Sequence, residues 1–301
     1  MNEGKERNLN EYPFTIPVIR NFKQIEFQKP VTFIIGENGT GKSTLIEAFA
    51  TCYGFNPEGG SKNFNFNTAS SHSLFYKFLK ISKTANFATD GYFLRAESFY
   101  NVASEIDRLD REGGGGRPIK ESYGGISLHE QSHGESFFSL LMHRLGGNGM
   151  YMFDEPEAAL SPMRLLTLLV RLDELVKQNS QFIIATHSPI LMAYPNSEIF
   201  EIKDGHLQKT KYEDTEHFQI TKYFMNCPQK MMQDLGIEKE DTYESLQEYF
   251  KEQDRLIAER KIQKPQIRYD VFTPEEQAEF DKGITWEDVF ENNMKKNKRA
   301  G

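Results

Sequence analysis

The stretch VTFIIGENGTGKS, Val31 to Ser43, joins a strand-like run to a glycine-rich loop. An unbroken run of β-branched and aromatic residues is typical of a strand buried in a parallel sheet. Helical spacing follows the loop, because Leu45, Ile46, Phe49 and Ala50 fall on one face of a helix. A strand, a glycine loop and a helix in this order predict an α/β fold whose loop binds phosphate.

The loop itself, GENGTGKS, matches the pattern GxxxxGK[ST] of nucleotide-binding loops. Its glycines let backbone N–H groups turn toward a chain of phosphates, and the helix N-terminus adds positive partial charge. We expect Lys42 to reach the β- and γ-phosphates and the Ser43 hydroxyl to bind Mg²⁺. ATP and Mg²⁺ are the predicted cofactors. The predicted nucleotide-binding residues are Gly36, Asn38, Gly39, Gly41, Lys42, Ser43 and Thr44.

A second motif, MYMFDEPE, runs from Met150 to Glu157 and puts two acids at the end of a hydrophobic strand. Ligand sites of parallel sheets lie at the carboxyl ends of the strands. Asp154 is therefore expected to hold Mg²⁺, and Glu155 to act as general base toward the attacking water. The alternative is a pair of surface acids with no role in chemistry.

Two weaker motifs complete the set. QSHGES, Gln131 to Ser136, precedes a helical pattern, and by itself it predicts no more than a capped helix start. ATHSP, Ala185 to Pro189, follows the strand-like run QFIIAT and contains His187. A single histidine after a strand is more often structural than catalytic. A functional role for His187 is therefore inferred only from the order of the motifs.

That order resembles the ABC ATPases: a phosphate loop, a Ser-x-Gly-x-Ser segment at a helix start, a strand ending in Asp-Glu, and a strand ending in Thr-His. The resemblance implies that Ser132, Gly134 and Glu135 form a signature element that binds the γ-phosphate held by a second copy. It implies further that His187 is the switch histidine near that phosphate, and that ATP binding produces a homodimer.

Longer segments of the sequence indicate which subfamilies of ATPases the chain resembles. DEPEAALSP resembles a stretch of SMC-like and overcoming-lysogenization-type ATPases, with Ser161 in the D-loop where histidine is usual. GFNPEGGSKNFNF, FLRAESFYNVA, SLHEQSHGES and THSPILMAYP resemble small bacterial proteins described as predicted ATPases of the AAA family. Two departures stand out: no glutamine stands at the expected Q-loop, where Glu97 is either its equivalent or an ordinary acid at a strand end, and the D-loop lacks its usual aspartate.

Alternating strands and helices predict a mostly parallel sheet covered by helices on both faces. The antiparallel part is expected at the N-terminus, in strands over 16–19 and 25–28, and a hairpin is expected around Asp204-Gly205. Helices are expected over 75–81, 137–145 and 165–176. Residues 1–235 are predicted to form an ABC-type P-loop NTPase head, and residues 236–301 a charged helical appendage.

Composition narrows the class of protein. The 301 residues are 38% hydrophobic and 27% charged, which is ordinary for a globular protein. A net charge of −8 argues against a protein that binds nucleic acid over its whole surface, although it allows a local basic patch. Two distant cysteines predict no disulfide framework, and no apolar run is long enough to span a bilayer. The start, MNEGKERNLNEY, is too polar for a signal peptide, so a cytoplasmic protein without a membrane partner is expected.

Three functions agree with these features. The first is a stand-alone ABC-type ATPase that dimerises and acts as a switch or motor on a protein or nucleic-acid complex. The second is the nucleotide-binding subunit of a membrane transporter, disfavoured by the short, charged interval from Glu97 to Ser132 with its four glycines, 113–116. The third is a module that binds ATP without hydrolysing it, disfavoured by the presence of Glu155, Lys42 and His187.

Overall fold

The computed structural model describes residues 8–62, 73–83, 87–112, 118–130 and 133–237. Contacts divide the chain into two units, 1–227 and 228–301. Of the second unit, only the helix α8 (Pro228–Asp234) and the residues up to 237 are described. The predicted glycine loop at 113–116, the signature residue Ser132 and almost all of the predicted appendage lie outside the described residues. The boundary at 235 stays a prediction.

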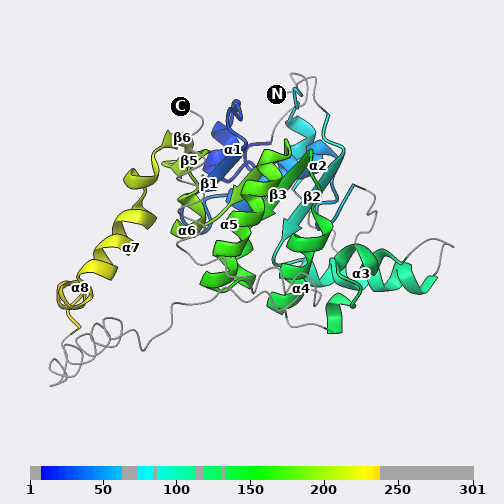
Figure 1. Cartoon of the computed structure of the whole chain (residues 1–301). Helices are drawn as coiled ribbons and strands as arrows, with labels where there is room; N and C mark the ends of the chain where they lie inside the picture. The colour runs from blue at the N-terminus through cyan, green and yellow to red at the C-terminus, as the bar shows by residue number, and fades with distance from the viewer. Residues whose placement is uncertain (1–7, 63–72, 84–86, 113–117, 131–132, 238–301) are drawn as a thin grey trace, which may run out of the picture. The chain divides into compact units, whose positions relative to one another are not determined.

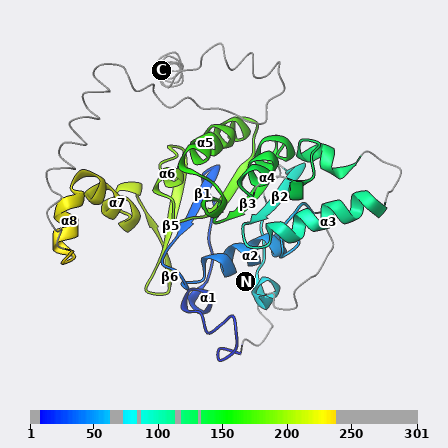
Figure 2. The same ribbon diagram turned by 90° about the horizontal axis from the view of Figure 1, so that it is seen from below.

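A six-stranded sheet organises the first unit, in the order β2-β3-β4-β1-β5-β6 (Figures 1 and 2). All neighbouring strands are parallel except the last pair, β5 and β6, which forms an antiparallel hairpin. The strands are β1 (Val31–Ile35), β2 (Asp90–Arg95), β3 (Gly149–Asp154), β4 (Gln181–Ala185), β5 (Ser197–Lys203) and β6 (His206–Thr210). The mostly parallel α/β fold is thus confirmed.

Helices cover both faces of the sheet (Figure 2). One face packs against α1 (Pro17–Asn21), α2 (Lys42–Tyr53) and the 3-10 helix η1 (Leu74–Phe78); the other packs against α3 (Phe99–Glu112), α4 (His133–Ser139), α5 (Pro162–Lys177) and α6 (Pro189–Met192). Shorter elements are η2 (Ile119–Tyr123), η3 (Leu128–Glu130), the π-helix η4 (Leu140–Arg144), η5 (Pro156–Ala159) and η6 (Tyr212–Asp214), and α7 (Glu216–Asn226) ends the unit.

Alternation along each strand creates two hydrophobic layers. In β1, Phe33 belongs to the layer under α3 and α5, whereas its neighbour Ile34 belongs to the layer under α2. Phe153 and Met152 of β3 divide in the same way. Strands buried on both faces need apolar residues at every position, which explains why the strands read as continuous hydrophobic runs.

The predicted antiparallel part at the N-terminus is wrong. Residues 17–19 fall in helix α1 and Ile16 caps it, because Pro17 stands at the first helical position, where its fixed φ and missing N–H are tolerated. No strand forms over 25–28. The side chain of Glu198 accepts the backbone N–H groups of Gln28 and Lys29, at 2.6 and 3.1 Å, in place of a strand partner.

Other elements agree more closely with the sequence. The predicted hairpin turns at Asp204 and Gly205, which both have positive φ (51° and 71°), as a tight two-residue turn requires. The predicted helix at 75–81 is shorter, a 3-10 turn that ends at Phe78. The predicted helix at 137–145 begins earlier, at His133, and changes to a π-helix at Leu140.

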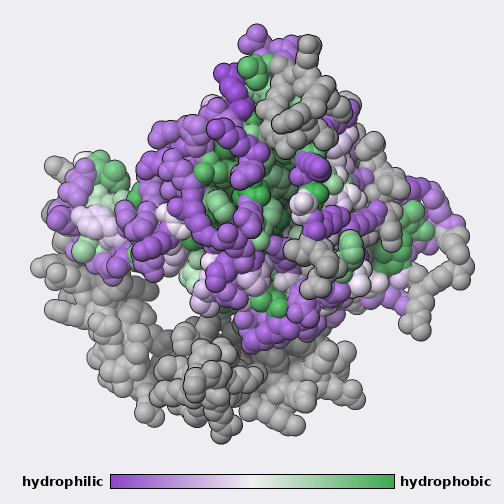
Figure 3. All heavy atoms as spheres, turned by 90° about the horizontal axis from the view of Figure 1, so that it is seen from above, coloured by the Kyte–Doolittle hydropathy of each residue, from purple (hydrophilic) through white to green (hydrophobic). Residues whose placement is uncertain are grey.

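The surface is mostly hydrophilic, as expected for a globular protein. Figure 3 shows hydrophilic side chains enclosing a smaller hydrophobic area on the face seen from above. No helix of the described residues is both long and apolar enough to cross a lipid bilayer.

Candidate functional site

The phosphate loop connects the end of β1 to the start of α2. Gly41 is the cap of α2 and has a φ of 103°, in the region that favours glycine. A Cβ built on Gly41 would lie 2.8 Å from Cγ2 of Ile16, so α1 packs too closely for any side chain there. The loop is therefore held from outside by the segment that the sequence predicted as a strand. Asn38 and Gly39 are exposed at its tip, and Thr44 is half-buried in the first turn of α2.

Lys42 lies inside this loop and is 4% exposed. Its Nζ donates to the carbonyl oxygens of Gly36, at 2.9 Å, and Glu37, at 3.0 Å. Burial lowers the pKa of Lys42, and the nearby carboxylates of Glu155 and Asp154 act in the opposite direction. Among the described residues the hydrogen bonds of this buried ammonium group go to carbonyl oxygens, so a bound anion would stabilise its charge further.

Ser43 and Asp154 come together from distant parts of the chain. The Ser43 hydroxyl donates to Oδ1 of Asp154 at 3.0 Å and so joins the phosphate loop to the end of β3. Burial raises the pKa of Asp154 to about 7, while Arg95 and the Ser43 hydroxyl lower it. A hydroxyl and a carboxylate are hard oxygen ligands of the kind that Mg²⁺ takes in nucleotide sites. The donor set therefore fits the predicted metal.

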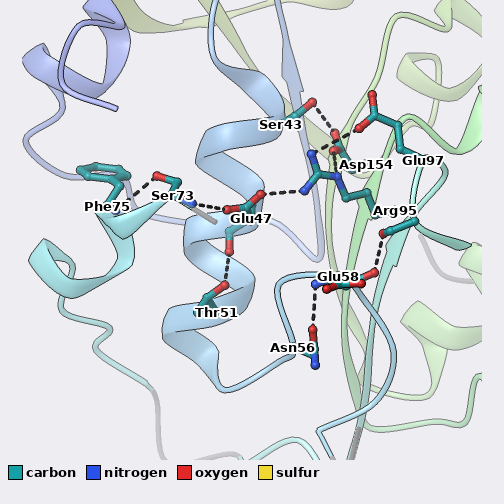
Figure 4. A network of polar contacts seen from close by, with 11 residues as sticks. Ser43, Glu47, Thr51, Asn56, Glu58, Ser73, Phe75, Arg95, Glu97 and Asp154 are labelled. Atoms are coloured by element: carbon teal, nitrogen blue, oxygen red, sulfur yellow. Dashed lines mark hydrogen bonds and ion pairs between the residues drawn. The ribbon is translucent and has the colours of Figure 1, made fainter. Parts of the chain in front are cut away.

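Arg95, at the end of β2, holds the carboxylates around this pair (Figure 4). Its Nη1 lies 2.6 Å from Oε2 of Glu47 on α2, and its Nε lies 3.7 Å from Oδ2 of Asp154. Register puts Arg95 directly opposite Asp154 in the neighbouring strand. Glu97 is 84% exposed, and its carboxylate lies 3.4 Å from Nη2 of Arg95. One guanidinium thus faces three acids, from α2, from β3 and from the turn that follows β2.

Glu155 and His187 follow the adjacent strands β3 and β4. The backbone N–H of Glu155 donates to the carbonyl of Ala185 at 2.9 Å, and Glu155 has the left-handed φ of 51°. Its Oε1 lies 3.5 Å from Nε2 of His187. Glu157 fixes the other side of this loop, because its Oε1 accepts the backbone N–H of His187 at 2.5 Å. Burial raises the pKa of Glu157.

The remaining predicted residues lie on other elements. Gly134 is in the first turn of α4, and a Cβ there would lie 2.6 Å from Nη1 of Arg164 and 3.1 Å from the carbonyl oxygen of Ala159. Glu135 is half-buried in the same turn. Ser161 caps α5, where its side chain accepts the N–H of Arg164. The described part of the signature segment thus packs against the segment after Glu155.

Comparison with models of known families shows to which family the chain belongs. The model of the AAA_23 family, described as an AAA domain, matches residues 10–300. The chain belongs to this family of AAA domains. Membership confirms the predicted resemblance to AAA-family ATPases, an ATP-binding class with a P-loop. No curated protein matches the chain in sequence.

Solved structures that resemble this AAA domain include an SMC head domain and components of ABC transporters. The SMC head domain from Thermotoga maritima is 18% identical, with a TM-score of 0.33, over 62% of this chain and 92% of its own. A dimeric bacterial ABC transporter cassette is 15% identical, with a TM-score of 0.37, over 64% and 89%. An ABC transporter component from Clostridium perfringens is 19% identical, with a TM-score of 0.35, over 68% and 87%.

Four polar residues of this AAA domain were not predicted from sequence. Arg95 and Glu47 form the buried ion pair, Glu157 holds the backbone of His187, and His217 on α7 contacts its ring. A signal exists only for Arg95, whose place at a strand end beside Glu97 resembles that of Asp154 beside Glu155. Glu157 lies inside the motif MYMFDEPE, two residues after Glu155, but the motif does not show that it binds the backbone of His187. Glu47 and His217 become neighbours of the site only through packing.

Proposed function

We propose that this chain binds ATP with Mg²⁺ and hydrolyses it to ADP and phosphate. The observation that supports this most strongly is the Ser43–Asp154 hydrogen bond, which joins the phosphate loop to the strand that ends in Asp154-Glu155. Lys42 binds the β- and γ-phosphates, and Glu155 accepts a proton from the attacking water. Ser43 and Asp154 are the residues that would hold Mg²⁺, which neutralises phosphate charge when bound. His187 contacts the γ-phosphate next to Glu155.

Glu155→Gln is the direct test. The amide keeps the shape of the side chain but no longer accepts a proton, so ATP binding should persist while turnover falls by at least about a hundredfold. Lys42→Ala should instead weaken ATP binding itself. Glu174→Gln, an exposed acid on α5, is the matched control and should hydrolyse ATP like the parent protein. Unchanged turnover in Glu155→Gln would reject Glu155 as the base.

We infer further that hydrolysis takes place in a head-to-tail homodimer. The signature segment with Ser132, Gly134 and Glu135 is separate in sequence from the phosphate loop. Gly134 packs against Ala159, before α5, and against Arg164, in the first turn of α5. In the proposed dimer the signature element covers the γ-phosphate held by the second copy, with Ser161 at the interface. Such a two-fold arrangement encloses two ATP molecules.

Mixed dimers test this arrangement. Lys42→Ala and Ser132→Arg should each be inactive alone. Mixed together, they should recover part of the activity, because one composite site in each mixed dimer keeps all of its groups. Sedimentation of Glu155→Gln with ATP should show a dimer, and without ATP mainly a monomer. Mixtures that stay inactive at every ratio, with only monomer present in ATP, would contradict the shared site.

The dimer is proposed to act as a switch or motor for a protein or nucleic-acid complex. ATP binding and hydrolysis give two states of the head, and a partner that prefers one of them is thereby controlled. Purification of the Glu155→Gln protein from its host, with and without ATP, followed by identification of the bound protein and nucleic acid, tests this. The same retained material in both preparations would count against ATP-dependent control.

A further inference from the structure

The ring of His187 contacts a second histidine, His217. Thr215 caps α7, accepting the N–H of Phe218 at 3.3 Å, and this fixes His217 in the first turn of the helix. Nδ1 of His187 lies 3.1 Å from Nε2 of His217, and the ring planes meet at 48°. The helix that ends the first unit thus reaches the ring that faces Glu155.

Only one proton can lie between the two nitrogens. Burial lowers the pKa of His187, as does Lys42, and burial also lowers the pKa of His217, so both rings are neutral near pH 7. A neutral imidazole has one N–H donor and one acceptor nitrogen. The hydrogen bond between the rings therefore decides which nitrogen of His187 remains to face the nucleotide.

The surroundings favour one arrangement of the protons. Nε2 of His187 faces Oε1 of Glu155, which accepts but does not donate, so this nitrogen should carry the proton. Nδ1 of His187 is then the acceptor, and Nε2 of His217 must donate. Nδ1 of His217 is left as an acceptor, and it is buried without a hydrogen-bond partner among the described residues. Nε2 of His187 is likewise buried without a hydrogen-bond partner among the described residues, so its approach of 3.5 Å to the carboxylate of Glu155, which attracts an N–H and repels a lone pair, decides between the two arrangements.

We propose that His217 is a positioning residue of the ATPase site, donating from Nε2 to Nδ1 of His187 and so holding His187 as an Nε2–H donor. This inference rests on the proposed function, because the donor is then directed at Glu155 and the γ-phosphate. The Nε2–Oε1 distance of 3.5 Å is one that a small side-chain rotation closes when nucleotide binds. The role of the switch histidine thus depends on a residue 30 positions later in the chain.

Substitutions at His217 separate this role from simple packing. His217→Gln keeps an amide N–H near the place of Nε2, whereas His217→Glu puts an acceptor there and His217→Ala leaves neither. His217→Ala and His217→Glu should lower kcat about tenfold or more, with the KM for ATP changed less than about twofold, because one catalytic group is misdirected. His217→Gln should restore most of kcat. Thr221→Ala, an exposed change on the same helix, is the control.

The tautomer of His187 gives a readout that does not depend on turnover. Nitrogen-15 NMR of the nucleotide-free full chain, with the signals assigned through His187→Gln, should show a protonated Nε2 and an unprotonated Nδ1 in His187. In His217→Glu the proton should move to Nδ1. A parent protein with the proton on Nδ1 of His187 would overturn the inference, and so would equal kcat values for His217→Gln and His217→Glu. If the parent protein does not hydrolyse ATP, the proposed function fails, while the NMR result still decides the tautomer.

Discussion

Removal of the Arg95 guanidinium should lower the free energy of unfolding substantially, because its carboxylate partners are buried. The side chain of Glu47 is 8% exposed and that of Asp154 is 5% exposed, and Arg95 is the cation nearest to both. Burial by itself lowers the pKa of Arg95, but Asp154 and Glu47 raise it, so the guanidinium stays charged. Arg95→Met keeps the aliphatic stem and leaves two buried carboxylates without their cation. We expect a loss of about 3–5 kcal/mol in the free energy of unfolding.

Lys177 supplies the matched control. Its Nζ lies 2.6 Å from Oδ2 of Asp173 on α5, the same distance as in the pair of Arg95 with Glu47, but these two side chains are 61% and 39% exposed. Surface pairs contribute little, because water already solvates both charges. Lys177→Met should therefore change stability far less than Arg95→Met does.

Urea unfolding of the nucleotide-free protein, followed by circular dichroism, measures both changes. The double variant Arg95→Met/Glu47→Leu should lose less than the sum of its single changes, because Glu47→Leu removes one of the unpaired charges. Similar losses for Arg95→Met and Lys177→Met would refute the reasoning from burial. Additive losses in the double variant would show that Arg95 and Glu47 do not interact.

Two further predictions concern other parts of the chain. Burial by itself raises the pKa of Asp90, but hydrogen bonds from Tyr151, the N–H of Gly146 and Arg144 bring it below its ordinary value. Asp90 therefore stabilises the fold above its unfolded pKa of about 3.9, and this contribution disappears as the pH falls through its lower folded pKa. The stability gap between parent and Asp90→Asn should be constant above about pH 5 and narrow below it; a gap independent of pH would be inconsistent with this. Truncation after Gly236 should leave ATP binding intact, as measured by calorimetry. A truncated chain that does not fold would show that residues 237–301 belong to the head.

The sequence predicts those parts of the candidate site that lie within short local motifs. The strand before the loop, Lys42, Ser43 and the Asp154-Glu155 pair are found where their motifs predicted, since each motif encodes its own strand and turn. The segment at 16–19 was misjudged because its apolar residues suit either a strand or a short buried helix, and Pro17 decides between them. α3 was not predicted, since its charged face dominates the sequence while Phe99, Val102, Ala103 and Ile106 pack inward.

Contacts between distant segments could not be predicted. Arg95 meets Glu47 only because the end of β2 lies beside α2, and His217 meets His187 only because α7 returns toward β4 after the β5–β6 hairpin. Neither pair has a characteristic spacing. Charge and hydrogen-bond partners of this kind depend on the whole fold, whereas the phosphate loop depends on a dozen consecutive residues.

Because the backbone of Glu155 is left-handed, substitutions there that raise thermal stability are expected to lower ATP turnover. A residue other than glycine, asparagine or aspartate with φ near 51° costs about 1–2 kcal/mol relative to an ordinary conformation. Random mutagenesis with selection for heat resistance should therefore accumulate glycine or asparagine at position 155, and each such variant would give up the carboxylate. Directed evolution of this chain toward higher melting temperature thus needs a parallel screen for ATP turnover, because substitutions that relieve this backbone strain remove the proposed general base.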